Sequence, residues 1–139
     1  MASIRKEILI EARPESVWAA VRDFGAAHRR LVPGLVVDTL VDGDARIVTF
    51  ASGAVIRELL VDVDDQARRL VYAAVEGPRG TTHHNASMQV FADGEGCSRL
   101  VWITDVLPND LAAPIGAVVE QGADVMKRTL ESHAARVAP

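Results

Sequence analysis

Cysteine and aromatic residues are scarce in this 139-residue sequence. Cys97 is the single cysteine, so an intrachain disulfide is excluded and cysteine usage says nothing about the redox compartment. Phe, Trp and Tyr together make up 4% of the residues, whereas hydrophobic residues make up 49%. Ala and Val must therefore supply much of the core, and small side chains fill an interior less completely than rings do.

An excess of positive charge and long apolar runs are also lacking. The formal net charge is −4 and the Lys and Arg residues are scattered, so nothing in the sequence indicates a nucleic-acid-binding surface. No apolar run approaches the ~20 residues of a membrane span. The N-terminus, MASIRKEILIEA, carries charges where a signal peptide would be apolar. We expect a cytoplasmic protein without membrane insertion, either a monomer or a homodimer.

Common catalytic motifs are missing as well. No Gly-rich phosphate loop follows a predicted strand, and the sequence contains no GxSxG, HExxH or CxxC pattern. Cys97 lies in a turn with no histidine assigned to it, which argues against a thiol nucleophile. The sequence therefore predicts no metal site.

The sequence does contain a regular succession of strand and helix patterns. Alternating apolar and polar residues, interrupted by turns such as Asp42-Gly43 and Ser52-Gly53, are typical of strands. The predicted strands cover residues 3–11, 35–41, 46–50, 55–63, 70–75, 81–91 and 98–106. A helix that begins at Pro14 and a short helix over 26–31 are predicted between the first two strands.

The last thirty or so residues predict one long helix, from 110 to 137. Apolar and small residues recur there at steps of three and four and form one stripe: Leu111, Ile115, Val118, Gly122, Val125, Met126, Thr129 and Val137. So long an amphipathic helix needs a partner surface of similar length. Because most of the remaining chain is predicted as strands, that partner should be a sheet.

These elements predict an α+β fold in the order β-α-α-β6-α, with residues 1–139 as a single domain. A seven-stranded antiparallel sheet that buries one face against one long helix is expected to curve around it. A curved sheet and one helix leave space between them unless large residues project inward. With so few aromatics, we expect a cavity.

Three short stretches resemble a known family. PESVW at 14–18, RELL at 57–60 and VW at 101–102 before Pro108 are similar to the START/Bet v 1 (SRPBCC) helix-grip superfamily. The bacterial polyketide cyclase/dehydrase-like proteins are most similar, and the plant abscisic-acid receptors are distant relatives. The resemblance implies a hydrophobic ligand cavity between helix and sheet, with no obligatory cofactor.

Some positions correspond to functional positions of those receptors. Residues 50–54 match the loop that closes over the ligand but lack its proline, and residues 77–81 match the second mouth loop but lack its histidine-arginine pair. A hormone-receptor function is therefore not expected. The resemblance implies that Glu58 points into the cavity and that His84 replaces a cavity-facing tyrosine.

Glu58 and His84 are the candidate catalytic residues. Alternation alone leaves two phases open for the strand over 55–63, one with Ile56 and Glu58 inward and the other with Glu58 in solvent; the resemblance favours the inward phase. Inside a low-dielectric cavity the neutral carboxyl is favoured, and such a group can act as general acid or base. His84 shares a face with Met88, which predicts that it points inward.

In the predicted sheet these two side chains come from strands about 10 Å apart, two strands away from each other. One group could remove a proton alpha to a carbonyl while the other protonates the oxygen, as in a cyclase or dehydratase. The same groups could instead bind one polar group of an apolar molecule, and His84 could be a hydrogen-bonded wall residue. The sequence does not separate these alternatives.

The predicted function is binding of a small hydrophobic molecule, aromatic or polyketide-like, with possible cyclisation or dehydration; the alternative is a non-enzymatic carrier or sensor. Tyr72 lies in a segment that is apolar in both phases, so its direction stays open, whereas Trp102 is expected to face inward. The predicted ligand-binding residues are Phe24, Phe50, Ile56, Tyr72, Ala73, Val75, Ala86, Met88, Trp102, Val118, Gly122, Val125, Met126 and Thr129.

Overall fold

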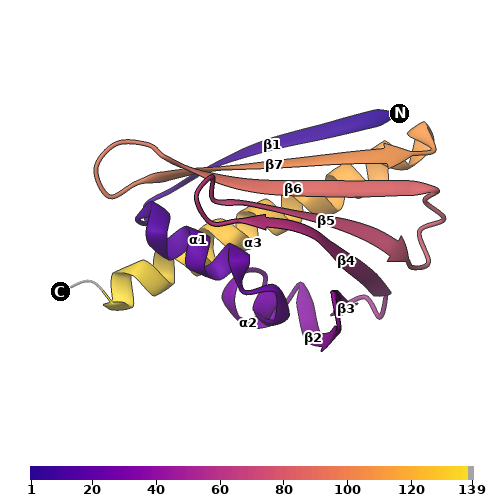
Figure 1. Cartoon of the computed structure of the whole chain (residues 1–139), viewed down its shortest axis with the longest axis horizontal. Coiled ribbons are helices and arrows are strands. Elements are labelled where there is room, and N and C mark those ends of the chain that lie inside the picture. Colours follow the sequence, from indigo (N-terminus) through magenta and orange to yellow (C-terminus); the bar gives the residue numbers. More distant parts are fainter. Residues whose placement is uncertain (138–139) are drawn as a thin grey trace.

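The computed structural model describes residues 1–137 and contains one antiparallel sheet of seven strands (Figure 1). The strands follow the order β1-β7-β6-β5-β4-β3-β2, so β2 to β7 form a meander and β1 joins beside β7. Their bounds are β1 (Ala2–Ile10), β2 (Val36–Asp42), β3 (Ala45–Phe50), β4 (Val55–Asp64), β5 (Arg69–Glu76), β6 (His83–Ala92) and β7 (Ser98–Leu107). The predicted strand order along the chain is confirmed.

Helices connect β1 to β2 and close the chain after β7. They are α1 (Pro14–Arg22), the 3₁₀ turn η1 (Phe24–Ala26), α2 (Ala27–Arg30), the 3₁₀ turn η2 (Asn109–Leu111) and α3 (Ala112–Val137). Pro14 occupies the first turn of α1, where its missing N–H costs nothing. Helix α3 starts at Ala112 because the residues before it form η2. The predicted helix-grip α+β fold is therefore confirmed.

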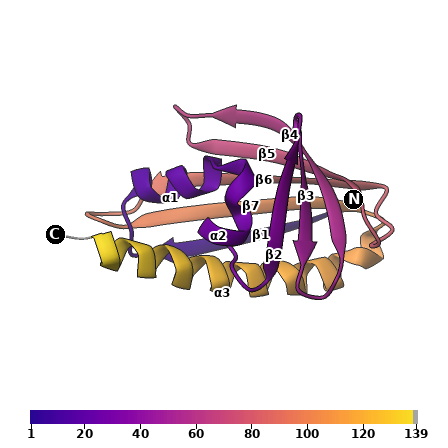
Figure 2. The same cartoon turned by 90° about the horizontal axis from the view of Figure 1, so that it is seen from below.

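The sheet curves around α3. Figure 2 shows α3 running along the length of β6 and β7, while β2 and β3 cross that direction steeply at one end. Register shifts between Arg57 and Glu58 and between Leu60 and Asp62 interrupt the pairing of β4 with β5. Such bulges increase local twist and bend a strand. They lie at the part of the sheet where it turns from the β5–β7 strands toward β2.

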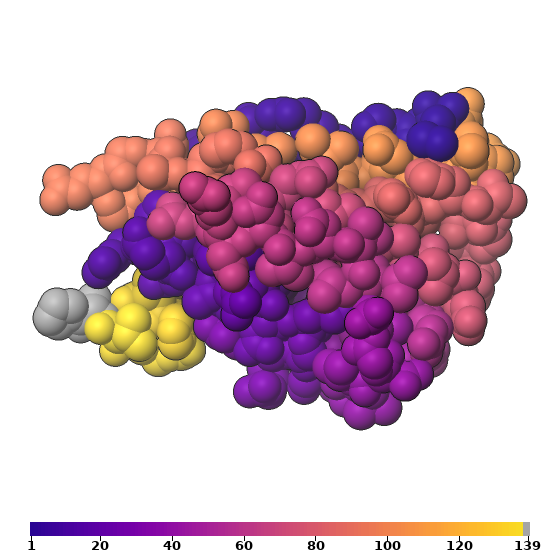
Figure 3. All heavy atoms as spheres, in the orientation of Figure 1, coloured from indigo at the N-terminus to yellow at the C-terminus, as the bar shows by residue number. Residues whose placement is uncertain are grey.

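The buried face of α3 differs in part from the predicted stripe. The buried residues are Ile115, Val119, Gly122, Ala123, Met126 and Leu130. Val118, Val125 and Thr129 are half-buried at the edge of this face, because it is centred closer to Val119 and Ala123. The prediction that Val137 belongs to the stripe is wrong, since it is 61% exposed. Figure 3 shows this end of α3 on the surface, beside α1.

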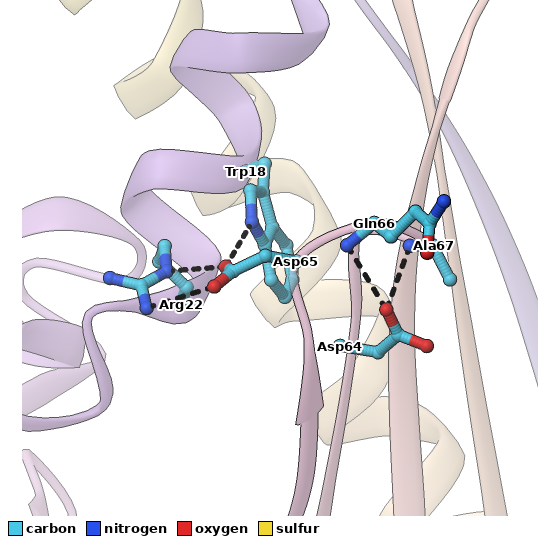
Figure 4. A network of polar contacts seen from close by, with 6 residues as sticks. All are labelled: Trp18, Arg22, Asp64, Asp65, Gln66 and Ala67. Carbon is cyan, nitrogen blue, oxygen red and sulfur yellow. Dashed lines mark hydrogen bonds and ion pairs between the residues drawn. The ribbon is translucent and has the colours of Figure 1, made fainter.

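Helix α1 is joined to the turn between β4 and β5 by polar contacts (Figure 4). The Trp18 Nε1–H donates to Asp65 Oδ1 over 2.9 Å, and Arg22 Nε donates to the same oxygen over 2.8 Å. Asp64 Oδ1 accepts hydrogen bonds from the backbone N–H groups of Gln66 and Ala67, which shapes the turn. These contacts hold α1 over one end of the sheet.

Strand β4 adopts the inward phase for Glu58. Ile56 and Glu58 are 2% and 8% exposed, whereas Val55 and Leu59 are 49% and 39% exposed. The open alternative with Glu58 in solvent is therefore excluded. Within residues 1–137, no helix combines the length and apolar character that crossing a membrane requires.

Candidate functional site

A cavity of about 70 Å³ lies between the sheet and α3. Side chains from α2, from strands β2 to β7, from connecting segments and from α3 surround it, and most of them are apolar. The lining residues are Ala27, Leu31, Val32, Leu35, Val36, Arg46, Phe50, Glu58, Tyr72, Arg79, His84, Met88, Trp102, Thr104, Ile115, Val118, Val119, Gly122 and Met126. A small set of polar groups in an apolar wall is typical of a ligand site.

Arg46 and Glu58 form an ion pair in the cavity wall. They face each other in the register of β3 and β4, and Arg46 Nε donates to Glu58 Oε1 over 2.8 Å. Their side chains are only 7% and 10% exposed. Arg46 also donates to the Phe24 carbonyl over 3.2 Å and lies over the rings of Phe24 and Tyr72. Glu58 is thus a partner of a buried cation, and not an isolated carboxyl in apolar surroundings as expected.

Tyr72 and Trp102 supply further polar atoms. Tyr72 is 5% exposed and faces inward, which settles the direction left open by the sequence. Burial, with a smaller contribution from the Glu58 carboxylate, raises the pKa of the Tyr72 phenol, so the hydroxyl remains a hydrogen-bond donor at neutral pH. Trp102 is 8% exposed, and its Nε1–H has no acceptor in hydrogen-bonding geometry among residues 1–137.

His84 faces the cavity from β6, as predicted, and is 8% exposed. Desolvation by burial lowers its pKa, Arg79 and His83 lower it further, and Glu58 opposes them. The imidazole is therefore neutral at pH 7 and able to accept a proton. Glu58 pairs with Ala74 on β5, and Ala73 pairs with Asn85 on β6, so Glu58 and His84 lie at nearly the same level of the sheet.

A wider hollow, which we call the vestibule, adjoins the cavity on the outside and has a volume of about 440 Å³. Leu35, Phe50, Arg79 and Val118 line both spaces and separate them. The other vestibule residues are Pro33, Gly34, Ala51, Ser52, Gln121, Val125 and Arg128. Both loops that the resemblance placed at the mouth contribute, through Phe50–Ser52 and through Arg79.

Most of the predicted site residues are brought together. Glu58, His84, Phe50, Tyr72, Met88, Trp102, Val118, Gly122 and Met126 line the cavity. Gly122 lies where a Cβ would come within 3.2 Å of the Trp102 ring, so the glycine permits the close approach of α3 to β7. Alternation and helical spacing predicted residues such as Met88 and Trp102, whereas the inward phase of Glu58 came from the resemblance and the direction of Tyr72 had been left open.

Other predicted ligand-binding residues lie elsewhere. Phe24 packs on Arg46 from outside the cavity, and Ala86 is buried in the core. Val125 lines only the vestibule. The Thr129 hydroxyl turns back to donate to the Val125 carbonyl over 2.7 Å. These residues are close to the site, but none of them lines the cavity.

Three residues of β4 and β5 that were expected at the ligand also lie outside the cavity. Ile56 and Val75 line a separate hollow of about 110 Å³ next to His84, and Val75 is 52% exposed. Ala73 follows the inward-facing Tyr72 and lines neither hollow, because successive strand residues point to opposite faces.

Arg46 and Arg79 are the important residues that sequence reasoning missed. A signal for Arg46 was present, because a turn centred on Ser52 places residue 46 opposite residue 58. Arg79 lies in an irregular loop, for which alternation predicts no direction. Thr104, Ile115 and Val119 were also missed as lining residues. Within residues 1–137, no group of three His, Cys, Asp or Glu side chains is placed to hold a metal ion.

Comparison with known proteins identifies the relatives of this fold. The sequence model of the family described as polyketide cyclase / dehydrase and lipid transport matches residues 1–138. No curated protein matches the chain in sequence.

Solved structures show the same fold at low sequence identity. The protein XoxI from Bacillus cereus is 19% identical, with a TM-score of 0.84 over 100% of this chain and 99% of that chain. A START superfamily protein from Mycobacterium smegmatis is 13% identical, with a TM-score of 0.75 over 98% and 99%. A norcoclaurine synthase point mutant from Thalictrum flavum, in complex with a transition state analogue, is 21% identical, with a TM-score of 0.69 over 95% of each chain.

Proposed function

Since this chain belongs to the polyketide cyclase / dehydrase and lipid transport family, we propose that it binds a small, mainly apolar molecule, aromatic or polyketide-like, between the sheet and α3. Family and fold both fit a protein that binds hydrophobic ligands. The observation that carries the proposal is the apolar cavity with a few buried polar groups, reached through the vestibule.

The size of the cavity limits how a ligand binds. About 70 Å³ is less than half of the roughly 150 Å³ cavity that accepts benzene in another protein. A ring therefore enters only if the side chains between cavity and vestibule, such as Leu35 and Phe50, move aside. We propose that the ligand spans both spaces, with its apolar end in the cavity.

A binding experiment with a neutral fluorescent probe, 1-aminoanthracene, tests this proposal. Val118 lines the cavity and the vestibule, so Val118→Trp should block the passage and abolish the fluorescence increase on binding. Ala117→Trp is the matched control, because Ala117 is the preceding residue of α3, is exposed and lines neither space. Equal binding by both variants, or no binding by the unchanged protein, would contradict the proposal.

A second candidate function is proton transfer to a bound carbonyl compound, supported by the lowered pKa of His84. His84 would accept the proton alpha to the carbonyl and return it, while the Tyr72 hydroxyl and the Arg46 guanidinium stabilise the developing oxygen charge. Glu58 would hold Arg46 in place, because its carboxylate is already bonded to that side chain. This differs from the acid/base role expected for Glu58 from the sequence.

A deuterium-exchange experiment distinguishes this catalytic function from that of a non-enzymatic carrier or sensor. Phenylacetone in D₂O would be incubated with the protein, and deuteration alpha to the carbonyl followed by NMR. We expect exchange that is lost in His84→Asn and kept in His83→Asn, because His84 faces the cavity and is 8% exposed whereas its neighbour points to the other side of β6. Binding of 1-aminoanthracene without any protein-dependent exchange would favour the carrier or sensor.

A further inference from the structure

The vestibule is positively charged in a protein that is negative as a whole. The sequence has 19 acidic and 15 basic residues, yet Arg79 and Arg128 line the vestibule and no Asp or Glu does. Arg128 is exposed on α3, and Arg79 reaches the vestibule from the loop between β5 and β6. This local reversal of charge lies at the passage into the cavity.

Arg79 is a half-buried cation without an ion-pair partner. Within residues 1–137, no carboxylate oxygen lies within 4.0 Å of its guanidinium, although most arginines of comparable burial, such as Arg57 and Arg68, have one. Removing a charge from water without a counter-charge costs free energy. Desolvation is the main cause that lowers the pKa of Arg79, and Glu58 opposes it from a distance.

The nearest buried carboxylate is already engaged. Glu58 Oε1 accepts from Arg46 Nε over 2.8 Å, so Glu58 is bonded to Arg46 and gives Arg79 only a longer-range attraction. His84 does not supply a negative charge and is neutral, since burial lowers its pKa. Arg79 is also held in position, because its guanidinium lies over the Phe50 ring at 5.2 Å from the centroid.

We infer that the ligand is an amphipathic anion, with its apolar part in the cavity and a carboxylate or phosphate group bound by Arg79 in the vestibule. The inference rests on the proposed ligand-binding function. Arg79 lines both spaces and so marks the boundary at which the apolar part ends and the charged part begins. A guanidinium binds either oxyanion by paired, charge-assisted hydrogen bonds. Arg128 adds a second, more exposed positive charge from α3.

Three ligands of similar shape test the inference by calorimetry: 3-phenylpropionate, its neutral amide 3-phenylpropionamide, and 2-phenylethylphosphonate. We expect at least one anion to bind about tenfold more tightly than the amide, as charge-assisted pairing in a half-buried site predicts. A tighter carboxylate indicates an organic acid as the natural ligand, and a tighter phosphonate indicates a phosphate ester. In Arg79→Gln the preference for the anion should disappear, because the anion loses far more affinity than the amide.

Arg29→Gln is the control for net charge. Arg29 is exposed on α2, lines neither space and has no ion pair among residues 1–137, so this variant should retain the preference for the anion. If the amide binds as tightly as both anions, or if the preference survives Arg79→Gln, the inference is wrong while the proposed function stands. If none of the three ligands binds and 1-aminoanthracene does not bind either, both are wrong.

Discussion

Arg46 and Glu58 occupy directly opposed positions on β3 and β4, and their side chains form an ion pair inside the cavity wall, with 2.8 Å between Nε and Oε1. Two aromatic rings and the Phe24 carbonyl complete the surroundings of the guanidinium. The pair determines what Glu58 is able to do, because one of its oxygens is occupied.

The first prediction concerns this ion pair. Arg46→Met should lower the free energy of unfolding by about 3–5 kcal/mol, because it leaves the Glu58 carboxylate buried without a counter-charge. Glu58→Leu should lower the free energy of unfolding by a similar amount, because it leaves the Arg46 guanidinium buried without a counter-charge. The double variant should cost less than either single variant, since no unpaired charge remains. Urea denaturation of all four proteins provides the measurement, and additive losses would contradict the prediction.

A failure of either single variant to fold does not prevent this test. The double variant is apolar at both positions, so it should fold even where Arg46→Met does not. If only the double variant folds, the unpaired charge in each single variant costs more than the stability of the protein, which agrees with the prediction. If the double variant is the least stable of the four proteins, the pair contributes to stability by more than mutual neutralisation.

The fold could be predicted from the sequence because its strands are regular. Alternation placed all seven strands to within a few residues, and turns such as Asp42-Gly43 lie where the structure has them. Alternation failed for β4 because Val55, Leu59 and Val61 are apolar yet 39–52% exposed, so both faces of the strand are apolar in sequence. The resemblance, and not periodicity, selected the correct phase.

The site could be predicted less completely, for a different reason. Apolar alternation identifies wall residues such as Met88 and Trp102. It does not identify a charged residue that faces inward, because alternation assigns charged residues to the solvent face. Arg46 is such a residue. Its partner becomes apparent only when the turn at Ser52 is used to set the register of β3 and β4, which pairs residue 46 with residue 58. On α3, helical spacing fits Val118 and Val119 about equally, and only packing against the sheet decides between them.

The second prediction concerns the attachment of α1. Asp65 accepts hydrogen bonds from Trp18 and Arg22, so Asp65→Ala should lower the urea midpoint of unfolding. Asp62→Ala is the matched control, because Asp62 is an exposed residue of the same strand end and its side chain makes no hydrogen bond among residues 1–137. Equal midpoints for the two variants would show that the contacts in Figure 4 contribute nothing.

The same carboxylate predicts a dependence on acid. Hydrogen bonds from Arg22 and then Trp18 lower the pKa of Asp65 below its ordinary value of 3.8. A group whose pKa is lowered by folding stabilises the protein above the unfolded-state value, and this contribution is lost as the pH falls through the folded-state value. The difference in stability between the unchanged protein and Asp65→Ala should therefore be constant near pH 7 and shrink below about pH 4.

The third prediction concerns the dependence of stability on pH that His84 causes. Burial lowers the pKa of this base, so the unfolded chain binds a proton at higher pH than the folded protein does. Stability should therefore fall as the pH drops below about 6.5, the unfolded-state value, and level off below the folded-state value. Burial is the main cause of the lowered pKa, the Glu58 carboxylate reduces the effect, and Arg79 and His83 add to it.

Urea midpoints between pH 7.5 and pH 5 would measure this effect. His84→Asn should lose less stability over this range than the unchanged protein. His83→Asn should stay close to the unchanged protein, because the His83 side chain points to the opposite face of β6 and is the smallest of the influences on the pKa of His84. The same loss in all three proteins would mean that His84 does not carry the dependence.

The last prediction uses two glycines of α3 that differ in their surroundings. A Cβ at Gly116 would have only Ile4 near it, at 3.9 Å, so Gly116→Ala should stabilise the protein by up to about 1 kcal/mol through helix propensity. A Cβ at Gly122 would lie 3.2 Å from two atoms of the Trp102 ring, so Gly122→Ala must shift that ring, which lines the cavity, by a few tenths of an ångström. Gly122→Ala should therefore be less stable than Gly116→Ala and bind 1-aminoanthracene more weakly than the unchanged protein. Equal stability and equal affinity in the two variants would show that α3 and Trp102 have room to separate, and that Gly122 does not define the cavity wall.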